Sequence, residues 1–244
     1  MSKGVRTSAS PALVCTVLLI PSMGAAQEDP LLTGNLSLSS DYVFRGISQT
    51  DESVQLQGDL SWSHPVGLYA GVWSTNTNVG GEGNSIEFDP YVGFAGPIGD
   101  TDFSYDVGYW HYFYPNSEGD FDFGEFYAIP TFSTGPWTVD LELWYALDYF
   151  GSDFFEDVSS LAYAGNVTYA FDQFSVMARL GQQTFDEPAE LSGQDYVYYD
   201  LGVSGDWRGV TLEVSWHDTD GVEPELADPD WADGRLVFGI SRAF

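Results

Sequence analysis

The sequence predicts an all-β fold: a transmembrane, antiparallel, up-and-down β-barrel of about twelve strands, with short periplasmic turns and long extracellular loops. Three features predict it. Apolar and polar residues alternate along many segments, the connections alternate between short and long, and the last segment ends on Phe244. A period of two places one face of each strand against lipid and the other face toward an interior.

The first 26 residues have the pattern of a secretory signal peptide. Lys3 and Arg6 precede the apolar stretch 12–20, and the small residues 24–26 precede Gln27. We therefore expect residues 1–26 to be removed and residues 27–244 to form a single barrel domain. The only cysteine lies in the removed segment, so the mature chain can form neither a disulfide scaffold nor a cysteine-based zinc site.

The composition of the mature chain is strongly acidic. It carries five Arg, no Lys and 37 Asp plus Glu, a formal charge of −32, which argues against nucleic acid as a partner. High net charge is common in disordered chains, but an aromatic content of 16% contradicts disorder. No stretch approaches the roughly 20 apolar residues of a membrane helix. In a membrane, therefore, only a closed barrel could satisfy this backbone.

Twelve segments show the alternation expected of strands. The predicted ranges are 34–47, 53–64, 68–75, 85–95, 102–114, 123–133, 137–150, 159–171, 174–184, 196–205, 209–218 and 235–244. The alternation is weakest in 123–133, where Pro130 is an awkward fit for a paired strand.

The connections between these segments sort by length. The short ones are 64–67, 96–101, 134–136, 172–173 and 206–208, and the long ones are 48–52, 76–84, 115–122, 151–158, 185–195 and 219–234. Outer-membrane barrels have this anatomy, whereas a soluble sandwich gives no reason for such sorting. We expect both termini on the periplasmic side.

Aromatic residues mark the expected membrane interfaces and the end of the chain. The predicted girdles comprise Tyr42, Phe44, Trp62, Tyr109, Phe113, Trp137, Tyr149 and Trp216. The last predicted strand presents Leu236, Phe238, Ile240 and Phe244 on one face. A terminal aromatic residue is typical of outer-membrane barrels, and we expect the barrel-assembly machinery to recognise this end.

One segment carries a family resemblance. Ser40-Asp-Tyr-Val-Phe-Arg-Gly-Ile-Ser-Gln-Thr50 resembles the opening signature of the TorF-type porin family of proteobacteria, and the segments 67–76, 87–96, 105–110 and 112–116 are also similar. The resemblance covers about residues 33–130. It implies a channel-type β-barrel in the outer membrane of a Gram-negative bacterium, and it supplies no catalytic residues.

Parity along the strands predicts an acidic lumen. The predicted pore-lining residues are Asp41, Arg45, Asp59, Glu87, Asp89, Asp106, Asp140, Glu142, Arg179 and Asp200. Because charged rings select ions of the opposite sign, we expect a cation-preferring channel for passive diffusion of ions and small solutes. Alternatively, these groups solvate a closed interior or form ion pairs, such as Asp41 with Arg45.

Inward aromatic residues should narrow the bore. They are Tyr69, Trp73, Trp110, Trp144, Tyr196 and Tyr198. Rings in this arrangement could instead form a stacking track for sugars.

The long loops carry most of the remaining acids and suggest a second function. In that alternative the barrel is closed, with a structural or surface-binding role, and its loops bind divalent cations, lipopolysaccharide or a partner. An inward-folded loop with a bulky apolar plug would favour it. Asp228, Asp230 and Asp233 are the candidate metal ligands, although their spacing departs from the EF-hand pattern. We expect no cofactor, contacts with outer-membrane lipid and lipopolysaccharide, and leave the oligomeric state open.

One group of residues raises the question of catalysis. Ser215 and His217 lie two apart on the lumenal face of one strand, next to Asp218. A triad needs serine and histidine within hydrogen-bond reach and a third group that orients the imidazole. An outer-membrane hydrolase is therefore a remote alternative, and lipase-like activity would require Ser215 at the outer face. We predict that the protein is not an enzyme.

Overall fold

The computed structural model describes residues 31–79, 86–117, 119–152, 158–186, 194–224 and 226–244. The predicted signal peptide lies outside these residues. The strands are β1 (Leu31–Ser39), β2 (Val43–Phe44), β3 (Ile47–Ser48), β4 (Gln55–Ser63), β5 (Leu68–Thr75), β6 (Glu87–Pro97), β7 (Phe103–Tyr112), β8 (Phe123–Thr134), β9 (Trp137–Ala146), β10 (Ser160–Ala170), β11 (Phe174–Phe185), β12 (Tyr196–Trp207), β13 (Val210–Asp220) and β14 (Arg235–Ala243), and the helix is α1 (Pro229–Ala232). Among the described residues no helix is long and apolar enough to cross a membrane.

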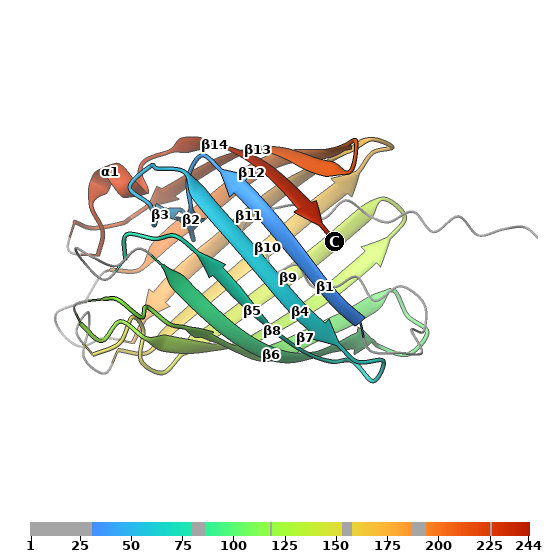
Figure 1. The fold of residues 1–244 in the computed structure, drawn as a ribbon, viewed down its shortest axis with the longest axis horizontal. Coiled ribbons are helices and arrows are strands. Elements are labelled where there is room, and N and C mark those ends of the chain that lie inside the picture. The colour runs from blue at the N-terminus through green and yellow to red at the C-terminus, as the bar shows by residue number, and fades with distance from the viewer. Residues whose placement is uncertain (1–30, 80–85, 118, 153–157, 187–193, 225) are drawn as a thin grey trace, which may run out of the picture.

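Twelve of the described strands form one closed antiparallel barrel (Figure 1). Each strand from β4 to β14 pairs with its neighbour in the chain, and β1 closes the sheet by pairing with both β4 and β14. The predicted fold class and strand number are confirmed. Closure leaves no strand edge, which is the condition for a sheet to satisfy its backbone inside lipid. The small β2–β3 sheet and α1 lie together at one end of the barrel (Figure 1).

The two faces of the barrel wall differ as the alternation predicts. Leu56, Leu201 and Phe238 point outward and are 62%, 57% and 56% exposed. Asp200, next to Leu201, points inward and is buried. The protein therefore carries its apolar side chains on the outside and its polar and aromatic side chains inside, the inverse of a soluble domain.

Several aromatic pairs lie at the end of the barrel that has the short turns. Trp137 packs on Tyr169 with ring centroids 4.7 Å apart, and Phe171 stacks on Phe174 at 4.4 Å. Of the predicted girdle residues, Trp62, Phe113, Trp137 and Trp216 are exposed on the outer surface.

Three girdle residues were predicted wrongly. Tyr42 and Tyr149 are buried, and Phe44 packs against the buried aromatic cluster. They belong to segments that leave the barrel wall at its long-loop end and turn inward, so their rings contact protein instead of lipid.

The first predicted strand, 34–47, is correct only in its first part. β1 ends at Ser39, and the chain then turns into the barrel. The turn is fixed by Asp41, whose Oδ1 accepts hydrogen bonds from the hydroxyls of Ser48 and Thr50, both at 2.7 Å. The tip needs residues with positive φ, and Arg45 (φ 47°) and Gly46 (φ 85°) occupy it. We call residues 40–50 the inner hairpin.

Pro130 does sit within a barrel strand. β8 pairs with β7 through Pro130, while its recorded pairing with β9 skips Ile129 and Pro130 and resumes at Thr131. A proline has no N–H to donate, so the ladder loses a bond on one side only. The side chain of Pro130 is exposed on the outer face.

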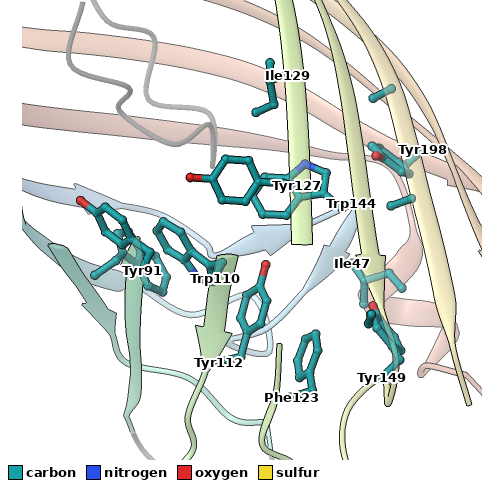
Figure 2. Packing of buried hydrophobic residues seen from close by; sticks show 14 of the residues in the cluster. Ile47, Tyr91, Trp110, Tyr112, Phe123, Tyr127, Ile129, Trp144, Tyr149 and Tyr198 are labelled. Carbon is teal, nitrogen blue, oxygen red and sulfur yellow. The ribbon is translucent and has the colours of Figure 1, made fainter. Parts of the chain in front are cut away.

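The buried core of the protein is the interior of the barrel (Figure 2). Tyr91 and Trp110 stack with centroids 4.4 Å apart and an interplanar angle of 1°. The predicted inward aromatics Tyr69, Trp73, Trp110, Trp144, Tyr196 and Tyr198 are all buried. These rings and the inner hairpin fill much of the lumen, which sets the limits on what could pass.

Candidate functional site

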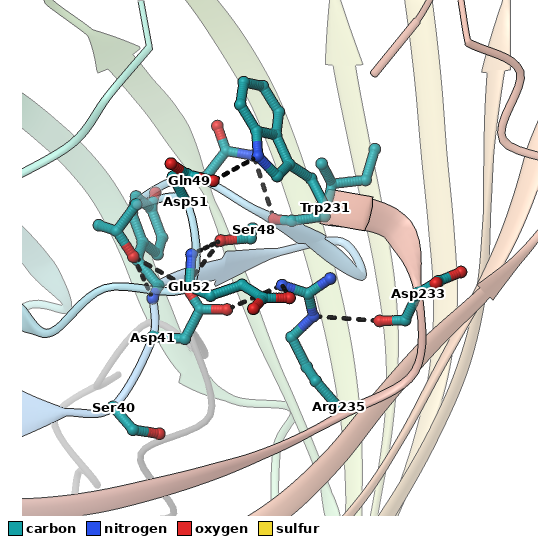
Figure 3. A network of polar contacts seen from close by, with 12 residues as sticks. Ser40, Asp41, Ser48, Gln49, Asp51, Glu52, Trp231, Asp233 and Arg235 are labelled. Carbon is teal, nitrogen blue, oxygen red and sulfur yellow. Dashed lines mark hydrogen bonds and ion pairs between the residues drawn. The ribbon is translucent and has the colours of Figure 1, made fainter. Parts of the chain in front are cut away.

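The inner hairpin occupies the lumen at the long-loop end. Tyr42, Val43, Ile47 and Thr50 are all buried, although none belongs to a barrel strand. Arg235 of β14 holds its base: Nη1 lies 3.1 Å from Asp41 Oδ2, and Nε donates to the carbonyl of Asp233 at 3.1 Å (Figure 3). The hairpin is therefore tied to the barrel wall.

The tip of the inner hairpin is held from the opposite side of the lumen. Arg45 Nη2 donates to Glu125 Oε2 of β8 at 2.7 Å, and Nη1 donates to Gln183 Oε1 of β11 at 2.8 Å. The Arg45 and Glu125 side chains are 6% and 0% exposed. Burial alone would lower the pKa of Arg45, but the Glu125 carboxylate raises this pKa well above its usual value, so the guanidinium stays charged.

The predicted ion pair of Asp41 with Arg45 is thus wrong. Asp41 pairs with Arg235, and Arg45 pairs with Glu125. Glu125 and Gln183 are not among the residues predicted to line the lumen. Glu125 lies two residues before the inward-facing Tyr127, so a period of two places it on the lumenal face as well. The alternation is weakest in this segment, which also contains Pro130.

Below the hairpin lies a cavity of about 80 Å³, which we call the inner cavity. It is lined by Tyr42, Phe44, Arg45, Gln57, Asp59, Trp73, Asp89, Tyr91, Trp110, Tyr112, Glu142, Trp144 and Arg179. The structure therefore brings five of the ten predicted pore-lining residues together at this cavity: Arg45, Asp59, Asp89, Glu142 and Arg179. The others, Asp41, Glu87, Asp106, Asp140 and Asp200, lie elsewhere on the inner surface.

Neutral donors hold the carboxylates of the inner cavity. Tyr91 donates its hydroxyl to Asp59 at 2.8 Å, and the Trp110 indole N–H donates to Asp89 at 2.9 Å. The Asn166 amide donates to Glu142. The two cations of the cavity have carboxylate partners outside it, since Arg45 pairs with Glu125 and Arg179 pairs with Asp200. Acidic groups therefore dominate this part of the wall.

A second and larger cavity, the outer cavity, lies on the loop side of the inner hairpin. Its volume is about 380 Å³, and it is lined by Phe44, Ile47, Ser48, Gln49, Asp51, Asn78, Val79, Phe121, Tyr149, Phe150, Tyr196, Leu226, Ala227 and Trp231. Phe44 lines both cavities. No pattern in the sequence assembled this set, because its members come from five different connections and one strand end.

Ser215 and His217 do form a hydrogen-bonded chain, but its third member is not the predicted one. Ser215 Oγ lies 2.9 Å from His217 Nε2, and His217 Nδ1 contacts Asp200 on the neighbouring strand. Asp218 instead accepts a hydrogen bond from Tyr199 at 2.9 Å. Ser215 is 2% exposed and points inward, so the outer-face condition for a lipase-like site is not met.

The backbone N–H groups around Ser215 are engaged in the barrel sheet. β13 pairs along its length with β12 and β14, so its peptide N–H groups are used in the sheet. A serine nucleophile needs preorganised donors for the developing oxyanion. Arg179 extends the Ser215–His217–Asp200 chain along the lumen wall by pairing with Asp200.

The candidate metal ligands lie at and beside α1. Asp228 caps this helix by accepting from the Asp230 N–H at 3.0 Å, and the carbonyls of Asp230 and Asp233 accept from Arg235. Within the described ranges no group of three or more His, Cys, Asp or Glu side chains is arranged to hold a metal ion.

Fold and lumen together define the class: a bacterial β-barrel of the outer-membrane type. The chain belongs to the family described as "Bacterial protein of unknown function (Gcw_chp)", whose model matches residues 25–244. The TorF designation is not part of that description. No curated protein matches the chain.

Solved structures share the fold at low sequence identity. The "KdgM porin" superposes with a TM-score of 0.59 at 11% identity, over 87% of this chain and 99% of that chain. The "KdgM porin in complex with disordered oligogalacturonate" gives 0.57 at 11% identity, over 87% and 98%. Outer membrane phospholipase A from Escherichia coli gives 0.51 at 15% identity, over 86% and 91%. Both porins and an enzyme use this architecture, so the side chains must decide the function.

Proposed function

We propose that this protein is an outer-membrane, porin-like channel for passive diffusion of ions and small solutes, and that it prefers cations. Asp59, Asp89 and Glu142 carry the proposal, because all three line the inner cavity and each accepts a hydrogen bond from a neutral donor. Carboxylates around a narrow passage attract cations and repel anions. In this function the three carboxylates act through their electrostatic field, and no covalent bond is made or broken.

The acidic lumen argues against a polyanionic solute. One structural neighbour is described as a complex with oligogalacturonate, which is a polymer of uronic acids. A passage lined by Asp59, Asp89 and Glu142 would repel such a chain. This neighbour therefore supports the barrel architecture and not the same solute.

A closed barrel with a structural or surface-binding role is the second candidate, and the inner hairpin favours it. Its apolar residues Tyr42, Val43 and Ile47 are buried in the lumen, and Arg45 fastens it to the far wall. Under this function the acidic loops would bind divalent cations, lipopolysaccharide or a partner. The two candidates differ in whether the hairpin moves.

Planar-bilayer conductance of the purified, refolded mature chain separates them. Folding is first verified by heat-modifiable mobility on a gel, and the reversal potential is then read across a KCl gradient. The channel proposal expects steady conductance with a reversal potential of cationic sign. If protein shown to be folded gives no conductance, the channel proposal fails and the closed barrel remains. A reversal potential of anionic sign would contradict the proposed cation preference.

A further inference from the structure

The outer cavity has the size and walls of a small-molecule site. Its volume of about 380 Å³ falls within the roughly 300–1,000 Å³ usual for ligand pockets. Most of its lining is apolar, with the rings of Phe44, Phe121, Tyr149, Phe150, Tyr196 and Trp231. Such a surface favours a ligand that is itself apolar over most of its area.

The polar groups of this cavity lie together on one side. Ser48, Gln49 and Asp51 come from the inner hairpin and the residue that follows it, and Asn78 lies beside them through the hydrogen bond from its N–H to the Gln49 carbonyl at 2.7 Å. The Trp231 indole donates to Asp51 Oδ1 at 2.9 Å, which fixes this carboxylate at the wall (Figure 3). Among the described lining residues, Asp51 carries the only charge.

The two cavities are arranged in series. Phe44 lines both, so its ring stands between the outer cavity and the acidic inner cavity. A solute that enters from the loop side first meets an apolar wall with one carboxylate, and then a wall of stacked rings with Asp59, Asp89 and Glu142. Aromatic rings and carboxylates both favour a cation.

We propose that the outer cavity binds small amphiphilic cations, that is, molecules with an aromatic or compact apolar body and one positively charged amino group. The apolar body lies among the rings, and the ammonium group faces Asp51. That this site is also the entrance to the lumen rests on the proposed channel function, whereas binding itself does not.

Three ring compounds that differ in charge test the proposal. Benzylamine is a cation at neutral pH, benzyl alcohol is neutral and benzoate is an anion. Saturation-transfer NMR on the full mature chain in lipid nanodiscs measures their binding. We expect benzylamine to bind at least about tenfold more tightly than benzoate, with benzyl alcohol between them.

Two variants place the binding in the cavity. Ala227→Trp fills the cavity and should weaken benzylamine about tenfold or more. Asp51→Asn keeps the shape and the acceptor for Trp231, so it should weaken benzylamine and leave benzyl alcohol unchanged. Val66→Trp, on an exposed turn at the other end of the barrel, adds a similar ring and should change neither.

Two results would contradict the proposed binding site. Equal benzylamine binding to wild type and Ala227→Trp would assign the signal to the lipid and overturn the site. Benzoate binding as tight as benzylamine would overturn the charge assignment. Because binding is measured without transport, a chain that binds benzylamine but conducts no current would remove the proposed channel and keep this site.

Discussion

Arg45 and Glu125 join the inner hairpin to the opposite wall of the barrel through a 2.7 Å ion pair in which both side chains are buried. The two residues are 80 positions apart in the chain. A buried ion pair that loses one partner leaves an uncompensated charge, at a cost of roughly 3–5 kcal/mol. This pair holds the tip of the hairpin, as the pair of Asp41 with Arg235 holds its base.

The first prediction is that Arg45→Ala releases the hairpin. Without the guanidinium, the buried Glu125 carboxylate loses its cationic partner, and outward movement of the hairpin lets water solvate this carboxylate. Single-channel conductance should rise several-fold. Val43 of the hairpin is buried and lines neither cavity, and residues 27–244 contain no cysteine. Val43→Cys should therefore react slowly with a maleimide in the wild-type background and rapidly with Arg45→Ala.

A matched control is Arg208→Ala, which removes an arginine from a turn at the other end of the barrel. Conductance and labelling should stay at the wild-type level in this variant. Slow labelling in both arginine variants would show that the hairpin is held by its apolar contacts and not by the ion pair.

The second prediction concerns ion selectivity. Asp59→Asn combined with Glu142→Gln removes two carboxylates of the inner cavity and keeps the side-chain shapes. The cation-to-anion permeability ratio should fall by about twofold or more. Asp172→Asn, in an exposed short turn, is the matched control and should leave the reversal potential in a KCl gradient unchanged. An unaltered ratio in the double variant would place the selectivity elsewhere.

The third prediction concerns packing in the lumen. At Gly93 an added Cβ would come 2.3 Å from the Tyr69 ring and 2.7 Å from the Tyr127 hydroxyl, so Gly93→Ala forces two buried rings to move. Overpacking of this kind costs about 1–3 kcal/mol. Urea titration, followed by heat-modifiable mobility, should show a lower midpoint. Gly165→Ala meets its nearest neighbour at 3.9 Å and should fold like wild type.

The fourth prediction is that Ser215 is not a catalytic nucleophile. It is buried, and the N–H groups of its strand are used in the sheet. A fluorophosphonate probe should therefore leave the folded protein unlabelled, as it should leave Ser215→Ala. Labelling of wild type that disappears in Ser215→Ala would contradict this and reopen the hydrolase alternative.

The barrel could be predicted because each of its determinants is local. The alternation of Leu56, Leu60 and Trp62 with polar residues lies within a single strand, and the turn lengths are read directly from the chain. The final strand lies within the predicted range 235–244, and next to it Gly34 and Phe244 exchange both backbone hydrogen bonds at 2.9 Å.

The inner hairpin could not be predicted in the same way. Asp41, Tyr42, Phe44 and Arg45 continue the alternation of the preceding strand, so parity alone extends the strand to Ile47. What turns the chain inward are hydrogen bonds from Ser48 and Thr50 to Asp41 and contacts with distant strands. The Gln183 partner of Arg45 is 138 residues away, and no periodicity within a strand reports such a contact.

The pairing of β1 with β14 also bears on how the barrel becomes stable in a membrane. β14 closes the barrel against β1, and the Phe244 ring packs so close to Gly34 that an added Cβ would lie 2.6 Å from it. A chain shortened at its carboxyl end would keep both β1 and β13 as open edges, which lipid does not tolerate. Pairing of β14 with β1 is thus a physical precondition for a stable barrel in lipid.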